Sequence, residues 1–220
     1  RLDVRVRAHV ICVAATRVEI QRQLDKPQAA GLTNIPDLRG DIPKNMERYH
    51  LEYRYASELI REIREAGDFC IGGACYPEGH TEAASKNEDI LHLKEKVDAG
   101  CEFLTTQMFF DNNILYNFLY RIREKGITVP VVAGIMPVTN GKQIKRICAL
   151  SGTTLPARFR SILDHFGDNP AAMKQAGIAY ATEQIIDLIA NGVRGVHVYT
   201  MNKPDVAESI LHNLSSILGR

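Results

Sequence analysis

The chain has 220 residues, and 27 Lys and Arg against 26 Asp and Glu leave a formal net charge of +1 at pH 7. This near balance argues against a nucleic-acid-binding protein that depends on bulk positive charge. With 45% hydrophobic and 24% charged residues, the chain has the composition of a globular protein, and none of its apolar runs approaches the roughly 20 residues of a membrane helix.

Short apolar segments rich in β-forming residues alternate with longer amphipathic segments, which is the pattern of a parallel α/β protein. The sequence predicts strands at residues 4–13, 33–38, 69–75, 102–106, 129–135 and 195–200. It predicts helices at residues 18–30, 53–66, 88–99, 113–125, 143–150, 171–190 and 206–218. No linker or low-complexity segment divides these β/α units, so we expect a single domain over residues 1–220.

Six β/α units fit either an open doubly wound sheet or a (β/α)8 barrel that lacks its first two units. The chain has no Gly-x-Gly-x-x-Gly after a strand, which argues against the usual dinucleotide-binding sheet. Polar residues gather instead just after the predicted strands, where a barrel places its active site. We therefore expect a (β/α)8 TIM barrel, and because the chain begins with Arg1 and not Met, we expect its N-terminal part to be missing.

Two clusters of polar residues are candidates for a binding site. Arg39, Gly40 and Asp41 follow a predicted strand and form a rim loop, in which an Arg suits a phosphate and a surface ion pair is the alternative. The second cluster shares one face of a predicted helix, where a solvated face is the alternative: Asp89, His92 and Lys96.

Taken together, these segments resemble the methylenetetrahydrofolate reductase family, whose members are flavin-containing (β/α)8 barrels that reduce a folate-bound methylene group to methyl. The resemblance is spread over most of the chain, in the order in which the family has its motifs. The segments that carry it are HVIC (9–12), LRGD (38–41), YAS (55–57), YPEGH (76–80), KVDAG (96–100), TQMFFD (106–111), GIMPV (134–138) and HVYTMN (197–202).

The resemblance implies FAD as the cofactor, with FMN as the alternative, and NAD(P)H as the electron donor. The residues that it implies for the flavin are His9, Arg39, Gly40, Asp41, Tyr55, Ala56, Tyr76, His80, Asp89, His92 and Lys96. Those that it implies for the folate substrate are Asp41, Gln107, Gln143 and Lys203. Asp41 is the implied catalytic residue, because it adjoins the flavin and accepts hydrogen bonds from the pterin. Two of these residues also fit structural roles: His9 suits an apolar core, and Gln107 could tie down a loop.

The chain also departs from the family's pattern. The general acid of the family is a Glu at the end of the first barrel strand, and this sequence does not show that strand. Neither Glu78 nor Glu82 matches the motif of the acid. Lys203 stands where many members carry Arg. Pro36 interrupts a strand that a barrel would keep apolar, and Pro cannot donate to the strand ladder.

We therefore expect flavin-dependent reduction of 5,10-methylenetetrahydrofolate to 5-methyltetrahydrofolate. The alternatives are a pterin-binding barrel methyltransferase without flavin and a non-catalytic barrel subunit. The expected protein partner is a second copy of the chain or an electron-transfer subunit. We expect the chain to bind no nucleic acid and to have no membrane span. The five Cys form no C-x-x-C, so we expect no metal site. An odd number of Cys indicates reduced thiols, and the N-terminal residues do not have the pattern of a signal peptide, so we expect a cytoplasmic protein.

Overall fold

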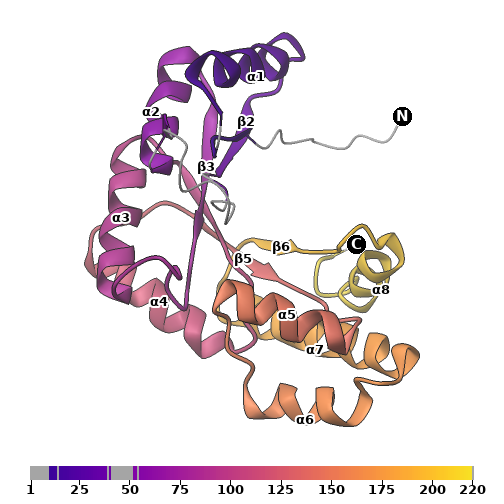
Figure 1. The fold of residues 1–220 in the computed structure, drawn as a ribbon. Coiled ribbons are helices and arrows are strands. Elements are labelled where there is room, and N and C mark those ends of the chain that lie inside the picture. Colours follow the sequence, from indigo (N-terminus) through magenta and orange to yellow (C-terminus); the bar gives the residue numbers. More distant parts are fainter. Residues whose placement is uncertain (1–9, 14, 39, 41–51, 54, 220) are drawn as a thin grey trace. The chain divides into compact units, whose positions relative to one another are not determined.

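The computed structural model describes residues 10–13, 15–38, 40, 52–53 and 55–219, apart from the side chains of residues 36–38. Strands and helices alternate along most of the chain (Figure 1), which confirms the α/β class, and three helices in succession separate the last two strands. The strands are β1 (Val10–Ile11), β2 (Asn34–Leu38), β3 (Cys70–Cys75), β4 (Phe103–Thr106), β5 (Val131–Ile135) and β6 (Val196–Val198). The helices are α1 (Arg17–Ala29), α2 (Ala56–Ala66), α3 (Lys86–Asp98), α4 (Asn112–Glu124), α5 (Gly141–Ser151), α6 (Ala157–Phe166), α7 (Pro170–Ala190) and α8 (Pro204–Asn213).

The strands pair in chain order, β1-β2-β3-β4-β5-β6. β2 is parallel to β1 and β3, and β5 is parallel to β6. The register of β2 continues through Pro36, which lies opposite Gly72. The interruption expected at Pro36 is therefore absent from the pairing. Successive residues of a parallel strand turn their N–H groups to opposite neighbours, so one Pro removes a single ladder bond.

By its internal contacts the chain divides into two compact units, of which the first comprises Arg1–Ala74, Ile90–Leu104 and Lys125–Pro130. Helices α1 and α2 pack on each other, α1 on β1 and α2 on β2. Leu59, Ile60 and Ile63 of α2 are fully buried, at the spacing of one helical face. A Cβ on Gly72 would lie 2.1 Å from the ring of Phe103. The absence of a side chain on Gly72 thus lets an aromatic ring lie directly on β3.

The second unit comprises Cys75–Asp89, Thr105–Glu124 and Val131–Arg220. In it α7 packs against α4, α6, α8 and β5. Its hydrophobic core contains Met108, Phe110, Val138, Ile144, Cys148, Phe159, Leu163, Met173 and Tyr180. Gly177 of α7 lies against the β5–α5 connection, since a Cβ there would be 1.8 Å from the oxygen of Val138. This close approach brings α7 directly onto the segment that follows β5.

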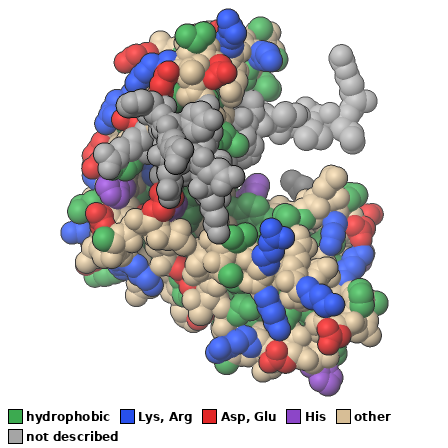
Figure 2. Space-filling view, viewed as in Figure 1, with side chains coloured by type: hydrophobic (Ala, Val, Ile, Leu, Met, Phe, Trp, Pro, Cys, Tyr) green, Lys and Arg blue, Asp and Glu red, His purple; other side chains and the backbone are tan. Residues whose placement is uncertain are grey.

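Two helices differ from the expectations. The sequence predicted no helix at α6, although Phe159 and Leu163 of α6 enter the core. The predicted helix over 53–66 begins only at Ala56, because Tyr55 has the extended backbone of an N-cap residue. Among the described residues no helix is both long and apolar enough to cross a membrane. Basic and acidic side chains are mixed over the face seen in Figure 2.

Candidate active site

Three of the residues expected to bind the flavin, His9, Arg39 and Asp41, lie outside the described residues. Gly40, between two of them, follows β2 with a φ of +83°, a conformation that favours glycine. A Cβ at this position would lie 2.7 Å from Cγ1 of Val13 and 2.8 Å from Cγ2 of Ile11. The backbone at Gly40 is therefore packed against the segment around β1, and a larger residue would displace it.

In the first unit, Tyr55 and His92 form a stacked pair. Their ring centroids are 5.7 Å apart and the ring planes differ by 19°. Tyr55 is 41% exposed and the His92 side chain 42%, so the pair can reach a ligand. Ala56, directly after Tyr55, is the first residue of α2. The structure thus brings Tyr55 and His92, which are 37 residues apart, into one surface.

Lys96 reaches the carboxyl end of β3. Its Nζ donates to the backbone oxygen of Ala74 at 2.5 Å. On α3, Asp89 and His92 precede Lys96 by seven and four residues, so the three side chains follow one face of the helix. The alignment expected from the spacing is therefore present, and it ends with a cation at the edge of the sheet where strands of an α/β protein meet their ligands.

In the second unit, Tyr76 and His80 lie together in the loop after β3. Their rings meet edge to face, with centroids 4.5 Å apart. Nδ1 of His80 accepts a hydrogen bond of 3.1 Å from the backbone N–H of Glu82, so a neutral His80 carries its proton on Nε2. Glu78 accepts from the backbone N–H of Thr154 at 3.0 Å. Glu78 therefore ties this loop to the segment after α5.

Gln107 directly follows β4. Its backbone N–H donates to the oxygen of Cys75 at 2.8 Å, and its side-chain Oε1 accepts from the N–H of Met108 at 2.9 Å. Within the part of the chain that the structure describes, Nε2 of Gln107 makes no hydrogen bond. The amide is thus oriented by its oxygen and keeps its donor for another group.

The other two residues expected to bind folate lie near the start of α5. Nζ of Lys203 donates to Oγ1 of Thr139 at 2.6 Å. Gln143 is exposed in the first turn of α5, and its backbone N–H donates to the side chain of Asn140 at 3.0 Å. The structure therefore ties Lys203 to the β5–α5 connection, which leads directly into the helical turn that carries Gln143.

Tyr199 and Thr106 belong to quoted motifs, but their sequence positions indicated no role for them. The hydroxyl of Tyr199 donates to the backbone oxygen of Thr106 at 2.8 Å. Burial, and then the nearby Cys75, raise the pKa of Tyr199 to about 12, so this donor keeps its proton at neutral pH. The contact fixes the residue that immediately precedes Gln107.

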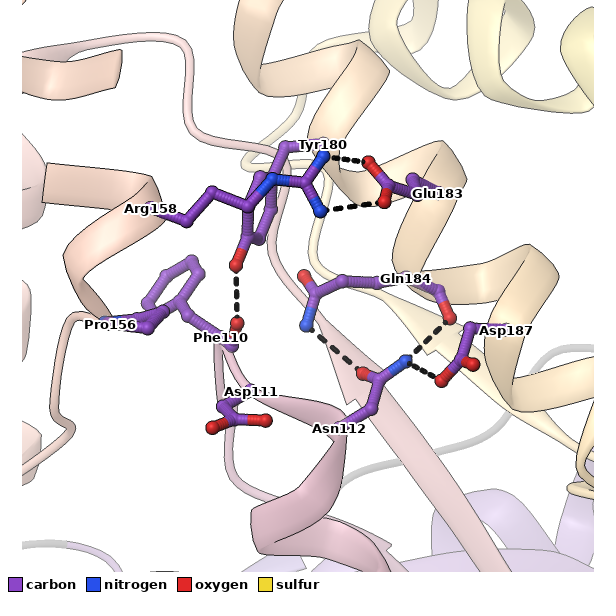
Figure 3. Close-up of a pocket in the computed structure, with 9 residues that line it drawn as sticks. All are labelled: Phe110, Asp111, Asn112, Pro156, Arg158, Tyr180, Glu183, Gln184 and Asp187. Atoms are coloured by element: carbon purple, nitrogen blue, oxygen red, sulfur yellow. Dashed lines mark hydrogen bonds and ion pairs between the residues drawn. The ribbon is translucent and has the colours of Figure 1, made fainter. Parts of the chain in front are cut away.

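A pocket of about 390 Å³ lies in the second unit, between the start of α4 and helices α6 and α7 (Figure 3). Its lining residues are Phe110, Asp111, Asn112, Pro156, Arg158, Tyr180, Glu183, Gln184 and Asp187. None of the residues expected to bind flavin or folate lines it. Arg158 forms a two-pronged ion pair with Glu183, which lowers the pKa of that carboxyl. The main cation of the pocket and one of its carboxylates are therefore already paired with each other.

The family model and the similar sequences agree with one another. The family model described as methylenetetrahydrofolate reductase matches residues 1–215. The 5,10-methylenetetrahydrofolate reductase of Escherichia coli (strain K12) is 34% identical over 214 residues, which are 97% of this chain and 71% of that protein. Methylenetetrahydrofolate reductase (NADH) 1 of Zea mays is 34% identical over 95% of this chain and 38% of its own length. The probable methylenetetrahydrofolate reductase (NADPH) of Caenorhabditis elegans is 36% identical over 94% of this chain and 32% of its own length.

Proposed function

We propose that this chain, which belongs to the methylenetetrahydrofolate reductase family, reduces 5,10-methylenetetrahydrofolate to 5-methyltetrahydrofolate through a bound flavin. The observation that carries the reaction is the family match over residues 1–215, which includes every motif quoted above. The relatives from Zea mays and Caenorhabditis elegans are named for NADH and NADPH. A nicotinamide nucleotide is therefore the electron donor that the family supports.

The described residues fit a flavin in two respects. The stacked, half-exposed rings of Tyr55 and His92 offer a flat surface for a planar or ribose group. Lys96 brings a cation to the end of β3, where a pyrophosphate needs one. The roles of His9, Arg39 and Asp41 come from the family resemblance alone.

The folate side is supported by the orientation of Gln107 and by the charge of Lys203. Because Oε1 of Gln107 accepts from Met108, its Nε2 can donate to a pterin or to the substrate carbonyl. Lys203 offers a positive charge for the carboxylates of the folate tail, without the two-pronged geometry of Arg. Asp41 would accept hydrogen bonds from the donor edge of the pterin.

When bound, a flavin supplies the hydride chemistry, since it accepts hydride from a nicotinamide and passes it to a second substrate. The residues of this chain bind and orient the reactants. Lys96 balances phosphate charge, and Gln107 holds the folate. Because Nδ1 of His80 accepts from the backbone N–H of Glu82, the Nε2–H of the neutral imidazole can donate one hydrogen bond toward a ligand. Proton transfer to the folate needs an acid, and the described residues include no match to the acid motif of the family.

Several finer properties belong to the same proposal. The six β/α units would form part of one (β/α)8 barrel domain, and the chain spans 71% of its Escherichia coli relative. FAD is preferred over FMN because Arg39 and Lys96 would provide two cations for a pyrophosphate. A second copy of the chain or an electron-transfer subunit would be the protein partner. All five cysteines are free thiols, which supports a reducing, cytoplasmic location.

The cofactor is tested by the absorbance spectrum of the purified protein, before and after incubation with FAD or FMN. A retained oxidised-flavin spectrum supports the proposal. A colourless protein that binds folate but neither flavin would instead favour a pterin-binding methyltransferase. Reduction of the bound flavin by NADH or NADPH, followed optically without oxygen, then identifies the donor.

A further inference from the structure

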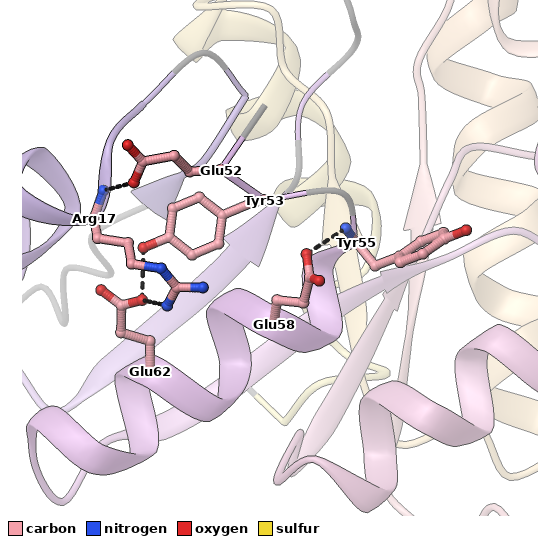
Figure 4. A network of polar contacts seen from close by, with 6 residues as sticks. All are labelled: Arg17, Glu52, Tyr53, Tyr55, Glu58 and Glu62. Carbon is pink, nitrogen blue, oxygen red and sulfur yellow. Dashed lines mark hydrogen bonds and ion pairs between the residues drawn. The ribbon is translucent and has the colours of Figure 1, made fainter. Parts of the chain in front are cut away.

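A buried tyrosine holds the segment that leads to Tyr55 (Figure 4). Tyr53 is only 1% exposed, and its hydroxyl donates to Oε2 of Glu62 at 2.7 Å. Nη1 of Arg17 donates to the same oxygen at 2.8 Å, and the guanidinium carbon of Arg17 lies 5.2 Å from the centroid of the Tyr53 ring. One carboxylate of α2 therefore joins the start of α1 to residue 53.

A second contact fixes the same segment. The backbone N–H of Arg17 donates to Oε2 of Glu52 at 2.8 Å. The start of α1 is itself held by a capping box between Thr16 and Glu19. Residues 52 and 53 are thus anchored to a helix end with a defined position.

The anchored residue Tyr53 lies close to Tyr55 along the chain. Tyr55 follows Tyr53 by two residues, so their Cα atoms can be no more than about 7 Å apart. The N–H of Tyr55 donates to Oε2 of Glu58 at 3.0 Å, and its ring stacks on His92. A shift of Tyr53 would therefore be transmitted to the position of the Tyr55 ring.

We propose that Glu62 is a positioning residue for the flavin site: it holds Tyr53 and Arg17 together, and thereby fixes Tyr55 against His92 before the cofactor arrives. The proposal rests on the proposed function, which assigns Tyr55 and His92 to the flavin. Glu62 acts through Tyr53 and does not itself touch the cofactor. Preorganisation of this kind favours binding because less conformational entropy is lost when the ligand is bound.

The first test is the affinity for FAD, measured by quenching of flavin fluorescence. Glu62→Gln removes the charge that holds both donors, so we expect FAD to bind about tenfold more weakly, the size of one charge-assisted hydrogen bond. Glu65→Gln is the matched control, because Glu65 is an exposed residue on the same helix with the same charge. Equal affinities in the two variants would overturn the proposal.

A thermodynamic cycle then separates positioning from general loss of structure. If Glu62 acts through Tyr55, Glu62→Gln should weaken FAD binding in the wild-type background and have no further effect in Tyr55→Ala. Additive effects in the double variant would contradict the proposal. So would a Tyr55→Ala variant with unchanged affinity for FAD.

A readout without flavin keeps the two proposals distinguishable. The stacked Tyr55 ring shifts the imidazole C–H resonances of His92, so Tyr55→Ala identifies that shift in the NMR spectrum. We expect Glu62→Gln to reduce the shift and Glu65→Gln to leave it unchanged. An unchanged His92 spectrum in Glu62→Gln would overturn the positioning role. A wild-type protein that bound no flavin would overturn the proposed function, and the NMR comparison would still decide whether Glu62 fixes Tyr55.

Discussion

The hydroxyl of Tyr199 donates a hydrogen bond of 2.8 Å to the backbone oxygen of Thr106, which joins the end of β6 to the end of β4. Gly134 of β5 completes this contact, because its N–H donates to Oγ1 of Thr106 at 2.8 Å. A Cβ on Gly134 would lie only 2.2 Å from the backbone oxygen of Thr106, the atom that accepts from Tyr199. Three strands are therefore held together immediately before Gln107.

The first prediction removes the tyrosine hydroxyl from this contact. Tyr199→Phe leaves the oxygen of Thr106 without its donor, so we expect a loss of about 1 to 3 kcal/mol in the free energy of unfolding. Urea denaturation measures the loss. Tyr120→Phe is the control, because Tyr120 is 66% exposed and should change stability by less than about 0.5 kcal/mol. Equal effects of the two variants would show that the contact contributes nothing.

The second prediction separates a substrate role of Gln107 from a purely structural one. Gln107→Glu keeps an acceptor for the N–H of Met108 but removes the Nε2 donor, whereas Gln107→Ala removes both. If Nε2 binds folate, both variants should weaken folate binding, by roughly 0.5 to 1.5 kcal/mol or more, and leave flavin binding unchanged. Calorimetric titration with folate and FAD tests this. Wild-type folate affinity in Gln107→Glu would mean that Gln107 only orders the loop.

The third prediction concerns pH. Burial, and then a hydrogen bond of 2.6 Å to Asp187, raise the pKa of Tyr116 to about 12. The same bond is the largest cause of the lowered pKa of Asp187. The stabilisation from Tyr116 is complete below its unfolded pKa of about 10 and is lost as pH rises through the folded value, whereas that from Asp187 is present above about pH 4 and is lost as pH falls.

Wild type and Tyr116→Phe should therefore differ most in stability near neutral pH. The difference should shrink toward both extremes, because either Asp187 becomes protonated or Tyr116 loses its proton. Urea unfolding of the two proteins over a pH series provides the measurement. A difference that stayed constant with pH would show that the Tyr116–Asp187 bond does not contribute to stability.

The fourth prediction compares two glycines. Gly177→Ala should improve the intrinsic helix propensity of α7 by about 1 kcal/mol, but its Cβ would lie 1.8 Å from the oxygen of Val138. The clash is the larger effect, so we expect a net loss of about 1 to 3 kcal/mol. In Gly195→Ala the nearest atom is 3.4 Å away, and stability should change little. Thermal unfolding of both variants decides whether α7 depends on close approach.

The alternation of strands and helices could be predicted because apolar periodicity is a local property of the sequence. Helix α6 was missed, because only two helices were expected between the last two predicted strands, at residues 143–150 and 171–190. Its signals were nevertheless present: Phe159 and Leu163 are at helical spacing, with Pro156 before them and Gly167 after. The register through Pro36 also lay beyond sequence reasoning, because it depends on the neighbouring strands.

In the site, too, the candidate residues could be predicted from the sequence, but their contacts could not. Motif order identified Gln107, Lys203 and the His92 face as candidates, but it could not identify their partners. The bond between Glu78 and Thr154 joins residues 76 positions apart, and Tyr53 meets Glu62 through side chains that were both assigned to one continuous helix. Such contacts arise from tertiary packing, and the periodicity of residues within one segment does not predict them.

The central claim, reduction of methylenetetrahydrofolate through a bound flavin, is tested most directly by one half-reaction. The natural gene product that contains this chain is loaded with FAD, reduced without oxygen and mixed with 5,10-methylenetetrahydrofolate in a stopped-flow spectrometer, and the product is counted. We predict reoxidation of the flavin with one 5-methyltetrahydrofolate formed per flavin, and slower reoxidation in Asp41→Asn. A flavin that stays reduced while the folate is bound and unchanged would contradict the account.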